Sequence, residues 1–162
     1  MEDQHMRPTA MLRRAGQSLW LDHITRDMLT DGTLQRYIDE LSISGLTSNP
    51  TIYQQAIAGS DAYDDQIGEG HRVGLRVEDI YFRLAIDDLQ RAADAFGPVH
   101  RATGGVDGFV SLEVSPHLAN DTEGTIAEAH RLAAAVHRDN LMIKVPATPE
   151  GVPAIQQLIS DG

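Results

Sequence analysis

A lysine lies inside a short apolar segment, which reads Asn-Leu-Met-Ile-Lys-Val-Pro-Ala-Thr over positions 140–148. In an extended strand, alternation puts Lys144 on the same face as Met142 and places the other apolar side chains opposite. Apolar surroundings remove water from an ammonium group, which favours the neutral amine. A neutral amine is a nucleophile that can form a Schiff base with a carbonyl substrate. The alternative is a strand-end lysine whose ammonium reaches solvent.

Polar residues also end three other apolar segments, in the form of Asp22, Asn49 and Glu113. If these segments are parallel strands, all four carboxyl ends lie at one edge of the sheet, where (β/α)8 barrels carry their catalytic groups. A single acidic strand end is more often a helix cap or a solvated loop residue. Two carboxylates, an amide and a lysine together favour a catalytic role for Lys144.

Chemistry with these groups requires no cofactor. Lys144 attacks a ketone, and the resulting iminium ion accepts electrons when the neighbouring carbon–carbon bond breaks. Asp22 is the candidate that takes the proton from the adjacent hydroxyl group. Glu113 suits the proton transfers of carbinolamine formation and dehydration, through a water molecule. Asn49 can hydrogen-bond the substrate hydroxyls and hold them in place.

The elements that must position these residues alternate between strands and helices. Strands are predicted at 18–22, 43–49 and 108–114 and around Lys144, and helices follow each of them, one a long helix ending at Gly97-Pro98. This order predicts right-handed βαβ units and a parallel sheet, hence an α/β fold. Residues 1–16 are expected to form a tail, 17–162 the folded domain, and about 50–76 a helical insertion within it.

Composition narrows the function classes. The 162 residues are 41% hydrophobic and 23% charged, which predicts a packed core. The net charge of −11 argues against nucleic acid and anionic membrane surfaces as partners. No apolar segment approaches the ~20 residues of a membrane span, so we expect a soluble cytoplasmic protein. The absence of cysteine and of a carboxylate completing any histidine pair indicates that no metal site is present.

Four segments resemble the signature regions of transaldolase in order and spacing. They are Leu-Trp-Leu-Asp at 19–22, Gly-Leu-Thr-Ser-Asn-Pro-Thr at 45–51, Val-Ser-Leu-Glu-Val-Ser-Pro at 110–116 and the lysine segment at 140–148. The resemblance implies a (β/α)8 barrel of the TIM type. Because such a barrel typically needs ~250 residues, the chain is expected to hold only about the first four β/α units.

The resemblance also implies an activity. Transaldolase transfers a dihydroxyacetone unit from sedoheptulose 7-phosphate to glyceraldehyde 3-phosphate in the pentose phosphate pathway. By motif match, Lys144 would be the Schiff-base lysine, Asp22 the general acid/base, and Glu113 the partner of the catalytic water. Asn49 and Thr47 would bind the sugar phosphate. The phosphate-binding arginines of the family are expected in its later strands, beyond these four β/α units. Among the arginines of this chain, Arg13, Arg14, Arg26 and Arg72 would contact phosphate only if they reach this edge.

An alternative to catalysis remains open at this point. Half a barrel leaves its first and fourth strands with unpaired edges and one sheet face open to water. The chain would then be a non-catalytic half-barrel that associates with a complementary half, or with itself as a homo-oligomer through the exposed sheet edges.

Overall fold

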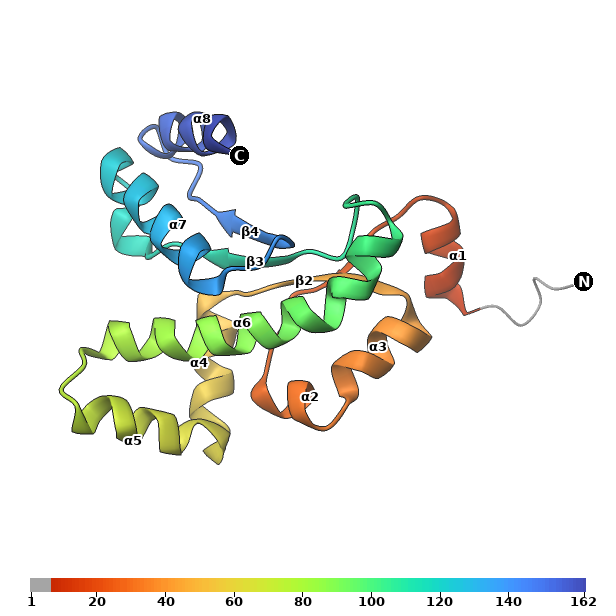
Figure 1. Ribbon diagram of the computed structural model, residues 1–162, viewed down its shortest axis with the longest axis horizontal. Helices are drawn as coiled ribbons and strands as arrows, with labels where there is room; N and C mark the ends of the chain where they lie inside the picture. The colour runs from red at the N-terminus through yellow and green to blue at the C-terminus, as the bar shows by residue number, and fades with distance from the viewer. Residues whose placement is uncertain (1–6) are drawn as a thin grey trace, which may run out of the picture.

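The computed structural model describes residues 7–162, in which a four-stranded parallel sheet lies among helices (Figure 1). None of the helices in this range is both long and apolar enough to cross a membrane. In chain order the elements are α1 (Pro8–Arg14), β1 (Leu19–Leu21), α2 (Arg26–Thr30), α3 (Thr33–Leu41), β2 (Ile43–Thr47), α4 (Pro50–Ala58), η2 (Asp61–Tyr63), α5 (Asp64–Arg72), α6 (Val77–Ala102), β3 (Val110–Glu113), η3 (Pro116–Leu118), α7 (Thr122–Val136), β4 (Leu141–Lys144) and α8 (Gly151–Asp161).

Each strand pairs in parallel with the strand that follows it, so the sheet order is β1-β2-β3-β4. Helices connect the successive strands, as parallel pairing requires. The predicted fold class, an α/β sheet of four successive β/α units of the TIM-barrel type, is confirmed. Register places Thr47 opposite Ser111 and Glu113 opposite Lys144. Strands β1 and β4 form the two edges.

The two faces of the sheet have different surroundings. One face packs against α3, α6 and α7 and supplies the strand contribution to the core, including the fully buried Leu46, Val110 and Leu112. Strand alternation places Thr47, Ser111, Glu113, Met142 and Lys144 on the other face. This second face stays partly accessible, since 44% of Met142 is exposed.

Helix α6 is longer than the sequence pattern predicts. The predicted end at Gly97-Pro98 is wrong, because the helix continues to Ala102 with Pro98 inside it. Proline removes a single intrahelical hydrogen bond, and Gly97 keeps a helical backbone here. The helix ends at Ala102 with Thr103 as its C-cap, and it is followed by Gly104 and Gly105, whose φ angles of 64° and 82° form the left-handed turn that glycine permits.

The two regions predicted to lie outside the regular alternation are helical where they are described. Residues 1–6 of the predicted tail lie outside the described range. The rest of the tail contains α1, and Arg7 forms an ion pair with Glu40 of α3 at 3.0 Å. The predicted insertion at about 50–76 contains α4, η2 and α5. In Figure 1, α4 and α5 extend from the sheet at the lower left, where α5 lies beside the first part of α6.

Candidate active site

The centre of the candidate site is an ion pair between the last residues of β3 and β4. Because these residues share a register position and a sheet face, their side chains meet: Lys144 Nζ lies 3.1 Å from Glu113 Oε2. Lys144 Nζ also donates a hydrogen bond to the carbonyl oxygen of Ser48 at 3.2 Å. The side chain of Lys144 is 40% exposed and that of Glu113 is 31% exposed. The expected loss of water around the amine is therefore only partial.

The hydroxyl groups of Thr47 in β2 and Ser111 in β3 lie on the same face as the ion pair, and Ser48 follows directly after β2. Ser111 Oγ donates to Thr47 Oγ1 at 2.8 Å, and Ser48 Oγ donates to the carbonyl oxygen of Ser111 at 2.9 Å. Thr47 Oγ1 in turn donates to the Ser48 carbonyl at 3.4 Å. Since Lys144 donates to that carbonyl as well, the Thr47 hydroxyl and the lysine amine share one hydrogen-bond acceptor.

Asn49 caps the helix that follows β2. Its Oδ1 accepts hydrogen bonds from the backbone N–H groups of Thr51 and Ile52, at 3.0 and 3.3 Å. Pro50 at the first helical position is preorganised for the same helix start. The side-chain oxygen is thus committed to the cap, and the NH2 group of Asn49 is the part that can donate to a substrate hydroxyl.

Asp22 lies on the far edge of the sheet from the lysine. It directly follows β1 and is exposed, whereas Lys144 ends β4, so two strands separate them. Among residues 7–162, Lys144 Nζ contacts Glu113 and the Ser48 carbonyl, and no ion pair or hydrogen bond joins it to Asp22. Register extension from Leu21 opposite Leu46 places Asp22 beside Thr47 instead. A substrate would have to bridge Asp22 and Lys144.

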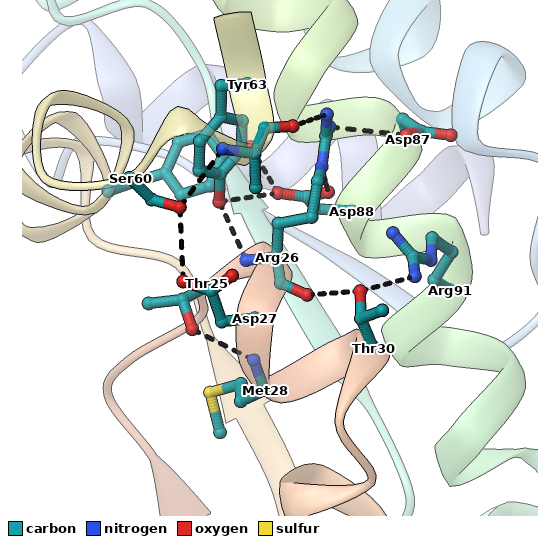
Figure 2. Close-up of polar contacts among 12 residues, drawn as sticks. Thr25, Arg26, Asp27, Met28, Thr30, Ser60, Tyr63, Asp87, Asp88 and Arg91 are labelled. Carbon is teal, nitrogen blue, oxygen red and sulfur yellow. Dashed lines mark hydrogen bonds and ion pairs between the residues drawn. The ribbon is translucent and has the colours of Figure 1, made fainter.

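A buried acidic residue anchors the helices that follow β1 and β2 (Figure 2). The carboxylate of Asp88 on α6, 1% exposed, accepts hydrogen bonds from Arg26 Nε at 2.9 Å, Tyr53 Oη at 2.7 Å and Tyr63 Oη at 3.0 Å. These partners come from α2, α4 and η2, so one carboxylate fixes three elements against α6. Arg26 also pairs with Asp87 at 3.3 Å. The guanidinium of Arg26 is therefore occupied by these carboxylates, which argues against its conditional role as a phosphate contact.

Comparison with known proteins decides the family. The model of the family "Transaldolase/Fructose-6-phosphate aldolase" matches residues 19–162. The chain belongs to this family.

Curated transaldolases resemble this family member along nearly all of its length. It is 48% identical to the transaldolase of Thiobacillus denitrificans over 97% of this chain and 44% of the relative. It is 48% identical to the transaldolase of Thermobifida fusca over 96% of this chain and 42% of the relative. It is 45% identical to transaldolase 2 of Nostoc punctiforme over 93% of this chain and 40% of the relative. The chain therefore spans about two fifths of the length of these relatives.

One further side chain of this transaldolase-family chain lines a groove beside Glu113 and was not predicted from the sequence. Tyr81 of α6 lines the same groove as Glu113. Burial first, and then the negative charge of Glu113, raise the pKa of Tyr81 to about 12. The only feature of the sequence that could have indicated Tyr81 is its position, a tyrosine at the border of the apolar helix face that contains Phe82. Within residues 7–162 no three histidine, aspartate or glutamate side chains gather as a metal site.

Proposed function

We propose that this chain carries the Schiff-base residues of a transaldolase. The observation that supports the proposal is the Lys144–Glu113 ion pair at the carboxyl ends of adjacent strands, in a chain of the transaldolase/fructose-6-phosphate aldolase family. The relatives named transaldolase are more than twice as long. The activity of the whole protein, its substrates and its partners are therefore parts of this proposal.

The ion pair provides a route to the free amine. Transfer of one proton from Lys144 to Glu113 over the 3.1 Å contact yields a neutral amine and a neutral carboxylic acid. The amine adds to the ketone carbon, and the resulting carbinolamine loses its hydroxyl as water when Glu113 returns that proton, directly or through a water molecule. Nitrogen then forms the C=N bond of a protonated iminium ion, and Glu113 is again a carboxylate.

Carbon–carbon cleavage requires a base at the other end of the substrate. We assign this role to Asp22, which directly follows β1, because a ketose bound to Lys144 at the end of β4 would have to extend across β3 and β2 to reach it. Asp22 removes the proton of the β-hydroxyl, the carbon–carbon bond breaks, and its electrons move into the iminium to form an enamine while an aldehyde leaves. Addition to a second aldehyde reverses these steps, and hydrolysis frees Lys144. Thr47 and the NH2 group of Asn49 hold the intervening hydroxyls.

The proposed substrates are sugar phosphates. The resemblance to transaldolase implies sedoheptulose 7-phosphate as donor and glyceraldehyde 3-phosphate as acceptor, in the non-oxidative pentose phosphate pathway. The proposal that the protein acts in the cytoplasm rests on the sequence composition alone.

Borohydride trapping tests this function directly. Lys144 is the only lysine of the chain, so a reduced adduct can be attached only to Lys144 or to the terminal amine. Incubation with fructose 6-phosphate and sodium borohydride is expected to add a three-carbon unit, seen by intact mass. Lys144→Arg should abolish the adduct. Asp22→Asn should trap the uncleaved six-carbon phosphate, because the iminium forms but cleavage lacks its base. A folded wild-type chain without adduct would refute the proposal.

The open sheet favours an additional property. We infer that the accessible face and the free edges of β1 and β4 associate with further protein, either a complementary half-barrel or a second copy of this chain. Unpaired edge strands present N–H and C=O groups to another strand. Size-exclusion chromatography with light scattering should therefore show oligomers of the 162-residue chain. A concentration-independent monomer with a sharp thermal transition would contradict the inference.

A further inference from the structure

A tyrosine of α6 and the carboxylate of the ion pair face the same groove. The groove, of about 770 Å³, lies between α4, α5, the first part of α6 and the segment after β3, and both Tyr81 and Glu113 line it. Tyr53 and Tyr63 bond to Asp88 through their hydroxyls. The Tyr81 hydroxyl, in contrast, makes no hydrogen bond with any residue in the range 7–162. It is available to a molecule that enters the groove.

The ring of Tyr81 is held without help from its hydroxyl. It packs edge-on against the ring of Tyr53, with centroids 5.7 Å apart, and against the ring of Phe82 at 5.4 Å. Tyr53 is itself 1% exposed and tied to Asp88 at 2.7 Å. Because edge-to-face contacts favour one ring orientation, the Tyr53 ring, anchored on Asp88, helps to hold the Tyr81 ring in place.

Charge and burial define what this hydroxyl can do. With its pKa raised to about 12 by burial and by Glu113, Tyr81 stays protonated at neutral pH. It is therefore a hydrogen-bond donor rather than a base. The charge that acts on this hydroxyl is the Glu113 carboxylate, which lines the same groove and is paired with the amine of Lys144 at 3.1 Å.

We propose that Tyr81 is a further positioning residue of the site, whose hydroxyl holds, together with Glu113, the water molecule that carries protons to and from the carbinolamine. The water accepts a hydrogen bond from Tyr81 and donates one to Glu113. This arrangement leaves one lone pair and one proton of the water for the reacting oxygen. The catalytic consequence rests on the proposed function, whereas the pairing of Tyr81 with Glu113 does not.

Titration of the tyrosines tests the pairing without any need for activity. Carbon-13 labelling of the tyrosine ζ position allows each phenol to be followed by NMR, and Tyr81→Phe assigns the Tyr81 signal. Glu113→Gln should lower the Tyr81 midpoint by about one pH unit, since a nearby negative charge is lost. Glu123→Gln on α7 is the matched control and should leave the midpoint unchanged. An unchanged midpoint in Glu113→Gln would overturn the proposal.

Trapping kinetics test the catalytic part. Tyr81→Phe keeps the ring contacts and removes the hydroxyl, so its melting temperature should match the wild type. The rate of Schiff-base trapping with fructose 6-phosphate should fall about tenfold, below the range for loss of a whole acid–base group. The fructose 6-phosphate concentration that gives half-maximal rate should stay the same. Tyr37→Phe on α3 is the control. A wild-type trapping rate in Tyr81→Phe would overturn the proposal. If no protein is trapped, including the wild type, the proposed function is refuted, and the titration alone decides whether Tyr81 is paired with Glu113.

Discussion

Removal of the buried carboxylate at position 88 should destabilise the chain strongly. Asp88→Asn keeps the shape of the side chain but replaces one acceptor oxygen by an NH2 group, which then faces a donor. Hydrogen bonds to charged groups contribute about 1.5–3 kcal/mol each, and breaking a buried ion pair costs about 3–5 kcal/mol. Arg26 keeps Asp87 at 3.3 Å and the Ala62 carbonyl at 3.2 Å, so the lower end applies. We expect a loss of about 3 kcal/mol.

The neighbouring residue provides a matched control for this prediction. Asp87 pairs with the same guanidinium but is 47% exposed, so Asp87→Asn should cost no more than about 1 kcal/mol. Urea unfolding followed by circular dichroism gives the free energies of unfolding. If Asp88→Asn does not fold, Tyr53→Phe removes a single bond to the same carboxylate and should cost about 1.5 kcal/mol. Equal losses for Asp87→Asn and Asp88→Asn would refute the reasoning.

Three other substitutions or conditions test particular contacts. A Cβ at Gly45 would lie 2.4 Å from the Trp20 ring, so Gly45→Ala should lower the free energy of unfolding by about 1–3 kcal/mol, and a Trp20→Ala background should remove most of that effect. Asn140 Nδ2 donates hydrogen bonds to the buried carbonyls of Ala93 and Gly108 at 2.9 and 2.8 Å. Asn140→Ala should lower the free energy of unfolding by about 2 kcal/mol, and the exposed Asn120→Ala by less than about 0.5 kcal/mol. Similar losses for both substitutions would contradict this assignment. Burial raises the pKa of Tyr63 to about 12 and that of Tyr53 further. The folded state thus resists an ionisation that the unfolded chain undergoes near pH 10. The stability that these tyrosines contribute should be fully present below that pH and should be lost as the pH rises through about 12, by up to ~1.4 kcal/mol per pH unit for each group. A urea midpoint that stays constant between pH 9 and 11.5 would exclude this linkage.

Much of the fold could be predicted because its patterns are local. The apolar alternation at Leu141–Lys144 and the 3.6-residue spacing of α7 each lie within one segment, and each gave a correct element. The end of α6 was mispredicted because Gly97 and Pro98 are local stop signals that packing overrode. Beyond the proline, Val99 packs against the core and His100 Nδ1 lies 2.8 Å from the Asp107 carbonyl oxygen. These contacts offset the cost of one missing hydrogen bond.

The site was predictable in its chemical groups but not in its contacts. The motif at 140–148 singled out the amine, and the segment at 110–116 singled out Glu113. That Lys144 meets Glu113, rather than Asp22, follows from the β3–β4 register and from the position of β1 at the opposite edge.

By itself, the sequence of this chain determined the alternation of strands and helices, the family resemblance and which amine is proposed to form the Schiff base. Only the tertiary structure decided that Arg26 is committed to Asp88, that Asn49 caps α4 with its oxygen, and that Tyr81 stands in the groove of Glu113. The physical reason is that periodicity and capping depend on neighbours in the chain. The meeting of side chains from different elements depends on strand register and on how each helix is rotated on the sheet, which the packing of the whole core sets.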